Sequence, residues 1–222
     1  MRGETEKVQP QDVAEAVQHY TAQTVPVHVE VAVDQVVLNF QDAEALLRRA
    51  NSISLGPCEC RTKHHHCAAP VNVCLTLNDA SGHAVETMEG FRRVTVDEAL
   101  DALRASHQAG LVHLAYRKPG VEATLFCSCC SCCCWFLNNL KRFDYHDAIV
   151  ESSHVAAHDA DRCVGCGLCV TRCPFDAWTH DTELPTLNRE KCFGCGVCVS
   201  GCPAGAISFG PRVAAYPPDA LQ

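Results

Sequence analysis

The sequence lacks the features of a membrane-spanning or secreted chain. Its most apolar stretch, Cys127 to Leu137, is mostly cysteine and serine and is shorter than the roughly 18 residues that a membrane span needs. Residues 1–12 are polar and contain no apolar core of a signal peptide. We therefore expect a cytoplasmic protein without a membrane span.

Motifs for nucleotide binding and for serine-hydrolase chemistry are also missing. The chain contains neither G-x-G-x-x-G nor a Walker loop, and no G-x-S-x-G elbow. We therefore expect that any flavin or nicotinamide would belong to a partner.

Positive charge is scarce, with 18 Lys and Arg against 26 Asp and Glu, which gives a net charge of −8. Such a chain is poorly suited to nucleic acid and better suited to a redox protein partner with a basic docking surface. The length of 222 residues corresponds to one or two domains. Nothing in the sequence defines an oligomeric state.

Cysteine, in contrast, is abundant, with 18 residues and none before Cys58. Without a signal peptide, this density indicates metal or iron–sulfur ligation in a reducing compartment rather than a disulfide scaffold. The last eight cysteines form an internal repeat. The segment Cys163 to Trp178 recurs as Cys192 to Ile207 with 9 of 16 positions identical.

Each copy reads C-x2-C-x2-C-x3-C-P. Three thiolates two residues apart on a glycine-containing loop can hold three corners of one cubane, and the fourth cysteine, before proline, points to the other cluster. A zinc ribbon would need neither the third cysteine nor the proline. The predicted ligands are Cys163, Cys166, Cys169 and Cys202 for cluster I, and Cys192, Cys195, Cys198 and Cys173 for cluster II.

This segment resembles the bacterial-type ferredoxins that hold two [4Fe-4S] clusters. The resemblance implies a ferredoxin-like fold and one-electron transfer. One departure is Trp178, followed by a polar run, where the second copy has Ile207 in a strand.

Ten further cysteines lie upstream, in two groups. Free thiols at this density would be prone to oxidation, so we predict a metal site at the junction of the two groups. One or two additional iron–sulfur clusters, a zinc or mixed site, and metal-free reactive thiols are the three alternatives. The residues are Cys58, Cys60, Cys67, Cys74, Cys127, Cys129, Cys130, Cys132, Cys133 and Cys134.

The upstream pattern resembles proteins described as 4Fe-4S dicluster domain-containing or ferredoxin-like. It consists of C-x-C-R and two more cysteines, then Gly110 to His113, then the Cys127 to Cys134 run. Together with the repeat, the resemblance covers about residues 54–209, and it implies no substrate.

Histidines near these groups are open to two interpretations each. His64, His65 and His66 form either a solvated basic loop or metal ligands, and His113 is either a hydrogen-bonded core residue or a ligand or proton donor. Arg61 either offsets thiolate charge, binds an anion or lies on the surface.

The predicted fold class is α+β, with an N-terminal mixed α/β cysteine-rich domain and a C-terminal ferredoxin-like two-cluster domain. The expected layout is 1–143 for the cysteine-rich domain, 144–158 for a linker, 159–211 for the two-cluster domain and 212–222 for a tail. We expect helices over 12–24, from Asp42 as cap, after the capping box Thr95 to Glu98, and over 135–143. Strands are expected over 25–33, 36–40, 111–116 and 123–126.

The function predicted from these patterns is electron transfer through two [4Fe-4S] clusters and an additional cysteine-ligated centre. Two alternatives remain: an oxidoreductase that reduces a small substrate at the upstream cysteines, and a wire subunit of a larger redox complex. We therefore expect a carrier rather than an enzyme, and no catalytic residue is predicted.

Overall fold

The computed structural model describes residues 23–25, 29–31, 34–117, 123–143 and 149–212. The helix expected over 12–24 lies outside this part up to residue 22, and its last residues belong to a strand. The strand expected over 25–33 is divided between β1 (Gln23–Val25) and β2 (Val29–Val31), which pair with each other in antiparallel fashion. The tail expected from residue 212 is described only at Arg212.

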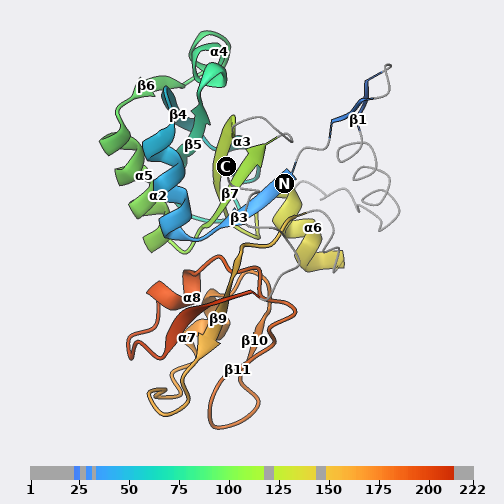
Figure 1. Cartoon of the computed structure of the whole chain (residues 1–222), viewed down its shortest axis with the longest axis vertical. Helices are drawn as coiled ribbons and strands as arrows, with labels where there is room; N and C mark the ends of the chain where they lie inside the picture. Colours follow the sequence, from blue (N-terminus) through green and yellow to red (C-terminus); the bar gives the residue numbers. More distant parts are fainter. Residues whose placement is uncertain (1–22, 26–28, 32–33, 118–122, 144–148, 213–222) are drawn as a thin grey trace, which may run out of the picture.

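The N-terminal domain is built on a six-stranded antiparallel sheet in the order β3-β7-β8-β5-β4-β6 (Figure 1). Its strands are β3 (Asp34–Leu38), β4 (Ile53–Pro57), β5 (Asn72–Leu77), β6 (Arg92–Val94), β7 (Val112–Arg117) and β8 (Leu125–Cys129). β3 pairs with β7 in antiparallel fashion. The β7–β8 pair confirms the two strands predicted on either side of residues 118–120.

One face of this sheet is covered by α2 (Phe40–Arg49) and α5 (Val96–Gln108), and α4 (Asp79–Thr87) packs at the β4–β6 end (Figure 1). The buried side chains between helices and sheet include Leu47, Leu100, Leu103 and Phe126. The capping box at Thr95 is present, with Glu98 bonded back to the Thr95 backbone. The cap of α2, however, is Asn39 rather than Asp42, which occupies the third helical position.

The opposite face carries the short helix α3 (Glu59–His64), α6 (Trp135–Phe143) and the C-terminal domain. α6 has the predicted bounds, and its buried side is made by Leu137, Asn139 and Leu140. Lys141 of α6 pairs with Asp176 of the C-terminal domain at 2.9 Å. The helix therefore contacts the C-terminal domain, and Figure 1 shows it between that domain and the six-stranded sheet.

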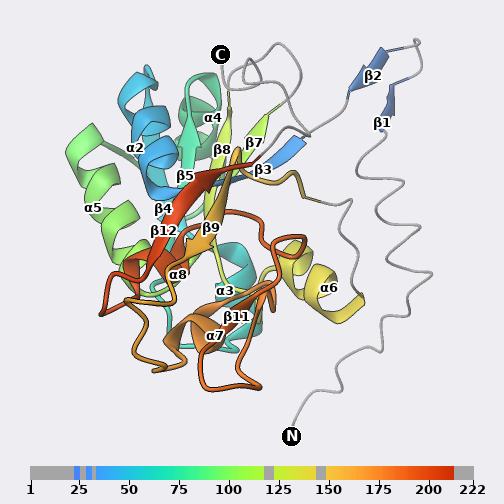
Figure 2. The ribbon, with the colours of Figure 1, turned by 60° about the horizontal axis from the view of Figure 1, so that its bottom comes forward.

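The C-terminal domain contains β9 (His154–His158), α7 (Leu168–Arg172), β10 (Trp178–Thr179), β11 (Thr186–Leu187), α8 (Val197–Ser200) and β12 (Ile207–Pro211). β9 pairs with β12, and β10 with β11 (Figure 2). Residues 144–158 were predicted as a linker, but the last five of them form β9. The strand escaped prediction because its partner lies 50 residues further along the chain. Trp178, the departure from the repeat, is buried in β10.

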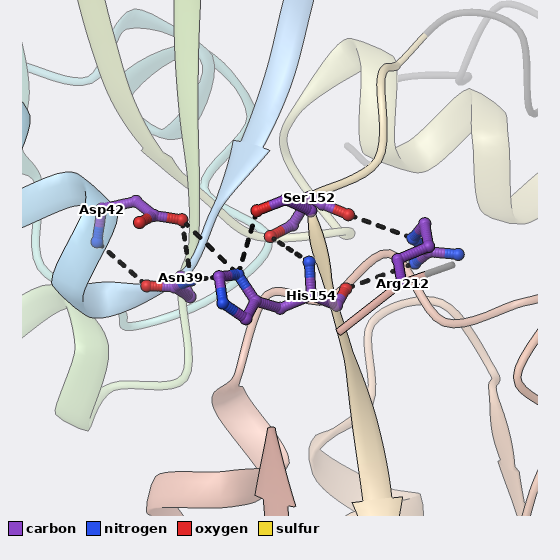
Figure 3. A network of polar contacts seen from close by, with 6 residues as sticks. Asn39, Asp42, Ser152, His154 and Arg212 are labelled. Carbon is purple, nitrogen blue, oxygen red and sulfur yellow. Dashed lines mark hydrogen bonds and ion pairs between the residues drawn. The ribbon is translucent and has the colours of Figure 1, made fainter. Parts of the chain in front are cut away.

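A polar network joins the two domains at the start of β9 (Figure 3). His154 lies 3.1 Å from the Asn39 amide nitrogen and 3.9 Å from a carboxylate oxygen of Asp42, so it contacts the first turn of α2. Arg212 donates to the backbone oxygens of Ser152 and His154 and pairs with Glu151. The network fixes the ends of β9 and β12 against the N-terminal domain.

Within the described ranges, no helix combines the length and the apolar character required to cross a membrane.

Candidate metal centres

Two separate cavities in the C-terminal domain are each lined by four cysteines. One is lined by Cys163, Cys166, Cys169 and Cys202, together with His158 and Pro185. The other is lined by Cys192, Cys195, Cys198 and Cys173, together with Phe175, Phe193 and Trp178. Each set takes three cysteines from one copy of the repeat and the fourth from the other copy, as the crossed arrangement predicted from the spacing requires.

The backbone around these cavities fits a cluster that accepts hydrogen bonds on sulfur. The N–H groups of Ala156, Ala177 and Ala206 donate to the sulfurs of Cys192, Cys173 and Cys202 at 3.3–3.5 Å. Gly194 has a φ of +74°, and a Cβ there would collide with the carbonyl oxygen of His154. A side chain at this position is therefore excluded by both the conformation and the space.

The two cavities differ in exposure. Cys166 is exposed and Val164 beside it is 68% exposed, whereas Cys192, Cys195 and Cys198 are all buried. Burial raises the pKa of Cys195 well above its ordinary value, and burial followed by the nearby Cys173 raises the pKa of Cys198 to about 12. Metal binding at the second cavity must therefore displace protons from buried thiols.

The ten upstream cysteines separate into two groups in space. We call Cys58, Cys60, Cys74, Cys127, Cys129 and Cys134 the six-cysteine group, and Cys67, Cys130, Cys132 and Cys133 the four-cysteine group. The division follows from the alternation of β8, because Cys127 and Cys129 point to the same face of the sheet as Cys74 of β5. The chain then turns after β8 and carries Cys130 away from that face.

The six-cysteine group forms a network of thiol contacts. The sulfurs of Cys74 and Cys127 are 3.9 Å apart. Hydrogen bonds from Cys129 and Cys74 lower the pKa of the Cys127 thiol, while the bond between Cys127 and Cys129 raises the pKa of Cys129. In the same way, a hydrogen bond from Cys60 lowers the pKa of Cys58 to about 6. Ionisation is thus favoured at Cys58 and Cys127 and opposed at Cys129, as expected for a set of sulfurs ready to bind metal.

The sulfurs of the four-cysteine group all lie within 4.8 Å of one another. Cys67 and Cys130 are 3.7 Å apart, and Cys132 and Cys133 are 3.9 Å apart. Burial opposes the ionisation of Cys130, but the hydrogen bonds from Arg61, Cys132 and the Cys133 backbone, with the charge of Arg61, together outweigh it and lower the pKa of this thiol to about 7.

Arg61 is buried between the two groups, with 1% of its surface exposed. Its guanidinium donates to the carbonyl oxygens of Ser128 (2.7 Å) and Pro70. It also forms a hydrogen bond with Cys130 and lies close to the charges of Cys58 and Cys129. Of the three interpretations of Arg61, the structure supports the one in which it offsets thiolate charge.

The histidines lie outside the sulfur groups. His113 is fully buried on the helix-covered face, where it contacts Ser128 (3.1 Å) and His107 (3.3 Å), so it is a hydrogen-bonded core residue. His66 is exposed and donates from Nδ1 to the carbonyl oxygen of Cys132 at 2.8 Å. His64 and His65 are exposed at the end of α3, as a solvated loop would be.

A buried contact region connects the six-cysteine group with the second C-terminal cavity. It contains Cys129 and Cys134 from the N-terminal domain and Cys195 from the C-terminal domain, with Cys127 and Cys173 packed against it. The rings of Phe175 and Phe193 stack there at 4.5 Å between centroids. Water is thus excluded between the two sulfur sites.

Comparison with protein families gives one match in this region. Residues 162–207 match the family model of the 4Fe-4S dicluster domain. The C-terminal segment is thus a ferredoxin-like iron–sulfur domain, which makes iron–sulfur clusters its cofactors. A comparison with curated proteins gave no match to the chain.

Three features of the site were missed by the sequence analysis. These are the division of the upstream cysteines into groups of six and four, the hydrogen bond from Tyr116 to Cys127, and the stacked rings of Phe175 and Phe193. All three depend on tertiary contacts. The sequence did contain one signal for this division. Side chains of a strand alternate between the two faces of a sheet, so Cys127 and Cys129 of β8 lie on one face, and Ser128 and Cys130 do not share it.

Proposed function

We propose that the protein is an electron carrier whose two [4Fe-4S] clusters pass electrons between a redox partner and a third centre at the six-cysteine group. Cys163, Cys166, Cys169 and Cys202 would hold cluster I, and Cys192, Cys195, Cys198 and Cys173 would hold cluster II. The observation that carries the proposal is the continuous buried region that joins Cys195 to Cys129 and Cys134.

The order of the centres follows from burial. Cluster I would lie at the exposed end, beside Cys166 and Val164, where a partner can approach. Cluster II would be enclosed between cluster I and the N-terminal domain. Each bound cluster supplies one-electron chemistry, and the protein contributes the dry path and the hydrogen bonds to sulfur that help set the potentials.

The six-cysteine group fits a cluster better than a set of free thiols. Its members include two buried cysteines and the Cys127 thiol, whose pKa the neighbouring thiols lower, and Arg61 opposes its negative charge. The redox partner, by charge, would offer a basic surface to a chain of net charge −8.

The test is a redox titration followed by electron paramagnetic resonance on anaerobically purified protein, compared with Cys129→Ser/Cys134→Ser. The expected result is a third paramagnetic centre in the wild type, about eight irons and eight sulfides for the two cubanes plus additional iron. The variant should keep the two cubane signals and lose the third. The relay to the N-terminal domain would be contradicted if the wild type held only two cubanes and if its redox titration were the same as that of the variant.

A second function, reduction of a small substrate at the six-cysteine group, is favoured by one observation. Tyr116 donates to Cys127, and burial together with the charge of Cys127 keeps the pKa of its hydroxyl well above the ordinary value. A proton donor beside a redox centre suits a reductase. Turnover by the reduced protein alone, lost in Tyr116→Phe with an unchanged third signal, would favour this function over the carrier.

A further inference from the structure

The four-cysteine group differs in compactness from every other cysteine group. Its four sulfurs lie within 4.8 Å of one another. Among the described residues, no other set of three or more Cys, His, Asp or Glu ligand atoms is gathered this closely. The two ferredoxin sets, which carry the cubane motif, are therefore wider and serve as an internal reference.

This compactness matches one ion and not a cluster. A tetrahedral ion with metal–sulfur bonds of about 2.3 Å holds its sulfurs about 3.8 Å apart. The two sulfur–sulfur distances of 3.7 and 3.9 Å agree with that edge. In a cubane each thiolate binds a different iron, so the sulfurs spread further.

The surrounding contacts hold the loops that supply these sulfurs. His65 adopts a left-handed conformation (φ 52°), which ends α3 and turns the chain toward Cys67. His66 then bonds to Cys132, and the N–H of Cys134 bonds to the oxygen of Cys130. Arg61 holds Pro70 on one side and Ser128 on the other. Both ligand-bearing loops are thus fixed independently of any metal.

The charge of the site is also compensated. Four thiolates around a divalent ion leave a net charge of about −2. The buried guanidinium of Arg61, bonded to Cys130, opposes that charge from within the protein. No histidine or carboxylate belongs to the compact group, which leaves a closed shell of four sulfurs.

We propose that Cys67, Cys130, Cys132 and Cys133 bind one thiolate-preferring metal ion, Zn²⁺ or Fe²⁺, rather than an iron–sulfur cluster. The ion closes the loop after α3 onto the turn between β8 and α6. A closed tetrathiolate shell has no open position for a substrate, so the site is structural and separate from the proposed relay.

The test measures zinc, iron and acid-labile sulfide per full-length chain, purified without oxygen, in the wild type and in Cys67→Ser/Cys132→Ser. The variant is expected to lose one metal ion and no sulfide. The matched control is Cys58→Ser/Cys74→Ser in the six-cysteine group, which should keep that ion whatever happens to its sulfide. Loss of zinc identifies the ion as Zn²⁺, and loss of one iron identifies it as Fe²⁺.

Loss of about four irons with four sulfides, or no change in metal content, would overturn the proposal. X-ray absorption at the zinc edge of the wild type gives an answer even if the variant does not fold, with four sulfurs at about 2.3 Å expected. If the chain holds no zinc, Mössbauer spectroscopy must detect a single high-spin iron apart from the clusters. The result does not depend on the electron-carrier function, because a single ion can be present whether or not the third redox centre exists.

Discussion

At the scale of single residues, Arg61 has a larger structural role in the N-terminal domain than its position in a basic segment suggests. The side chain lies next to Lys63 and three histidines in the sequence, which favours an exposed loop. In the structure it is buried, because the carbonyl oxygens of Pro70 and Ser128 and the thiolates around it satisfy the charge. No local pattern reveals such a contact between positions 61 and 128.

Replacing Arg61 should therefore be costly. Arg61→Met leaves two buried carbonyl groups and the thiolates without their cation, and we expect the free energy of unfolding to fall by about 3–5 kcal/mol. Urea unfolding of anaerobic protein measures this change. Arg48→Met is the control, since Arg48 pairs with Glu44 on the surface of α2 and should change stability by no more than about 0.5 kcal/mol. Equal effects of the two substitutions would contradict the buried role.

His113 makes stability depend on pH. Burial, and next the neighbouring His107, lowers the pKa of His113 to about 3, so the folded protein keeps it neutral. The unfolded chain binds a proton near pH 6.5, so folding loses stability as pH falls below that value toward 3. We expect the wild type to lose about 1.4 kcal/mol per pH unit more than His113→Gln does in this window. Comparing the slopes of the two proteins in urea unfolding cancels the acid loss of metal that both share, and parallel slopes would contradict the assignment.

At the scale of elements, short-range sequence patterns predicted the features that depend on neighbouring residues, such as helix ends. The capping box at Thr95 and the bounds of α6 are correct, because helix ends and helical periodicity depend on residues within a few positions. The spacing of the eight-cysteine repeat also groups the cysteines as they line the two cavities, and their role as cluster ligands stays a prediction. β9 and the grouping of the upstream cysteines could not be predicted, because each depends on partners about 50 or more residues away.

The loop that carries Cys192 to Cys198 should tolerate no side chain at Gly194. Gly194→Ala places a Cβ against the carbonyl oxygen of His154 at a φ of +74°, so the loop and β9 must separate. We expect the purified variant to lose about four irons and four sulfides, the content of one cubane. Gly82→Ala in α4 is the control, because its Cβ would meet only the end of Arg93 at 3.4 Å. It should keep all iron and gain up to about 1 kcal/mol. An iron content unchanged by Gly194→Ala would contradict the proposed cluster II.

At the scale of the whole molecule, the two C-terminal sulfur sites differ in exposure. Cys166 of the first cavity is exposed, whereas Cys192, Cys195 and Cys198 of the second are buried, and Phe175, Phe193 and part of the six-cysteine group pack in the same buried region as Cys195. Electrons from a partner would therefore enter at the outer end, and the inner sites would be shielded from oxidants.

This difference predicts the order in which clusters are lost. Under a slow oxidant such as ferricyanide, we expect one cubane signal to disappear first, with Cys163, Cys166, Cys169 and Cys202 becoming open to alkylation before the other set. Mass spectrometry of alkylated peptides, taken alongside the resonance spectra, identifies the set. Simultaneous release of both sets, or earlier release of Cys192 and Cys195, would show that burial does not protect the inner site.

The pairing of β9 with β12 also has a consequence for biosynthesis. β9, the first strand of the C-terminal domain, can pair only after β12, the last strand, has been synthesised. About 50 residues must be added between them. At typical synthesis rates of about 5–20 residues per second, the nascent chain exposes its repeat cysteines for roughly 3 to 10 s before the sheet can close. The repeat cysteines are therefore accessible on the nascent chain until β12 is made, and the β9–β12 pair can close only after the whole segment between them has been synthesised.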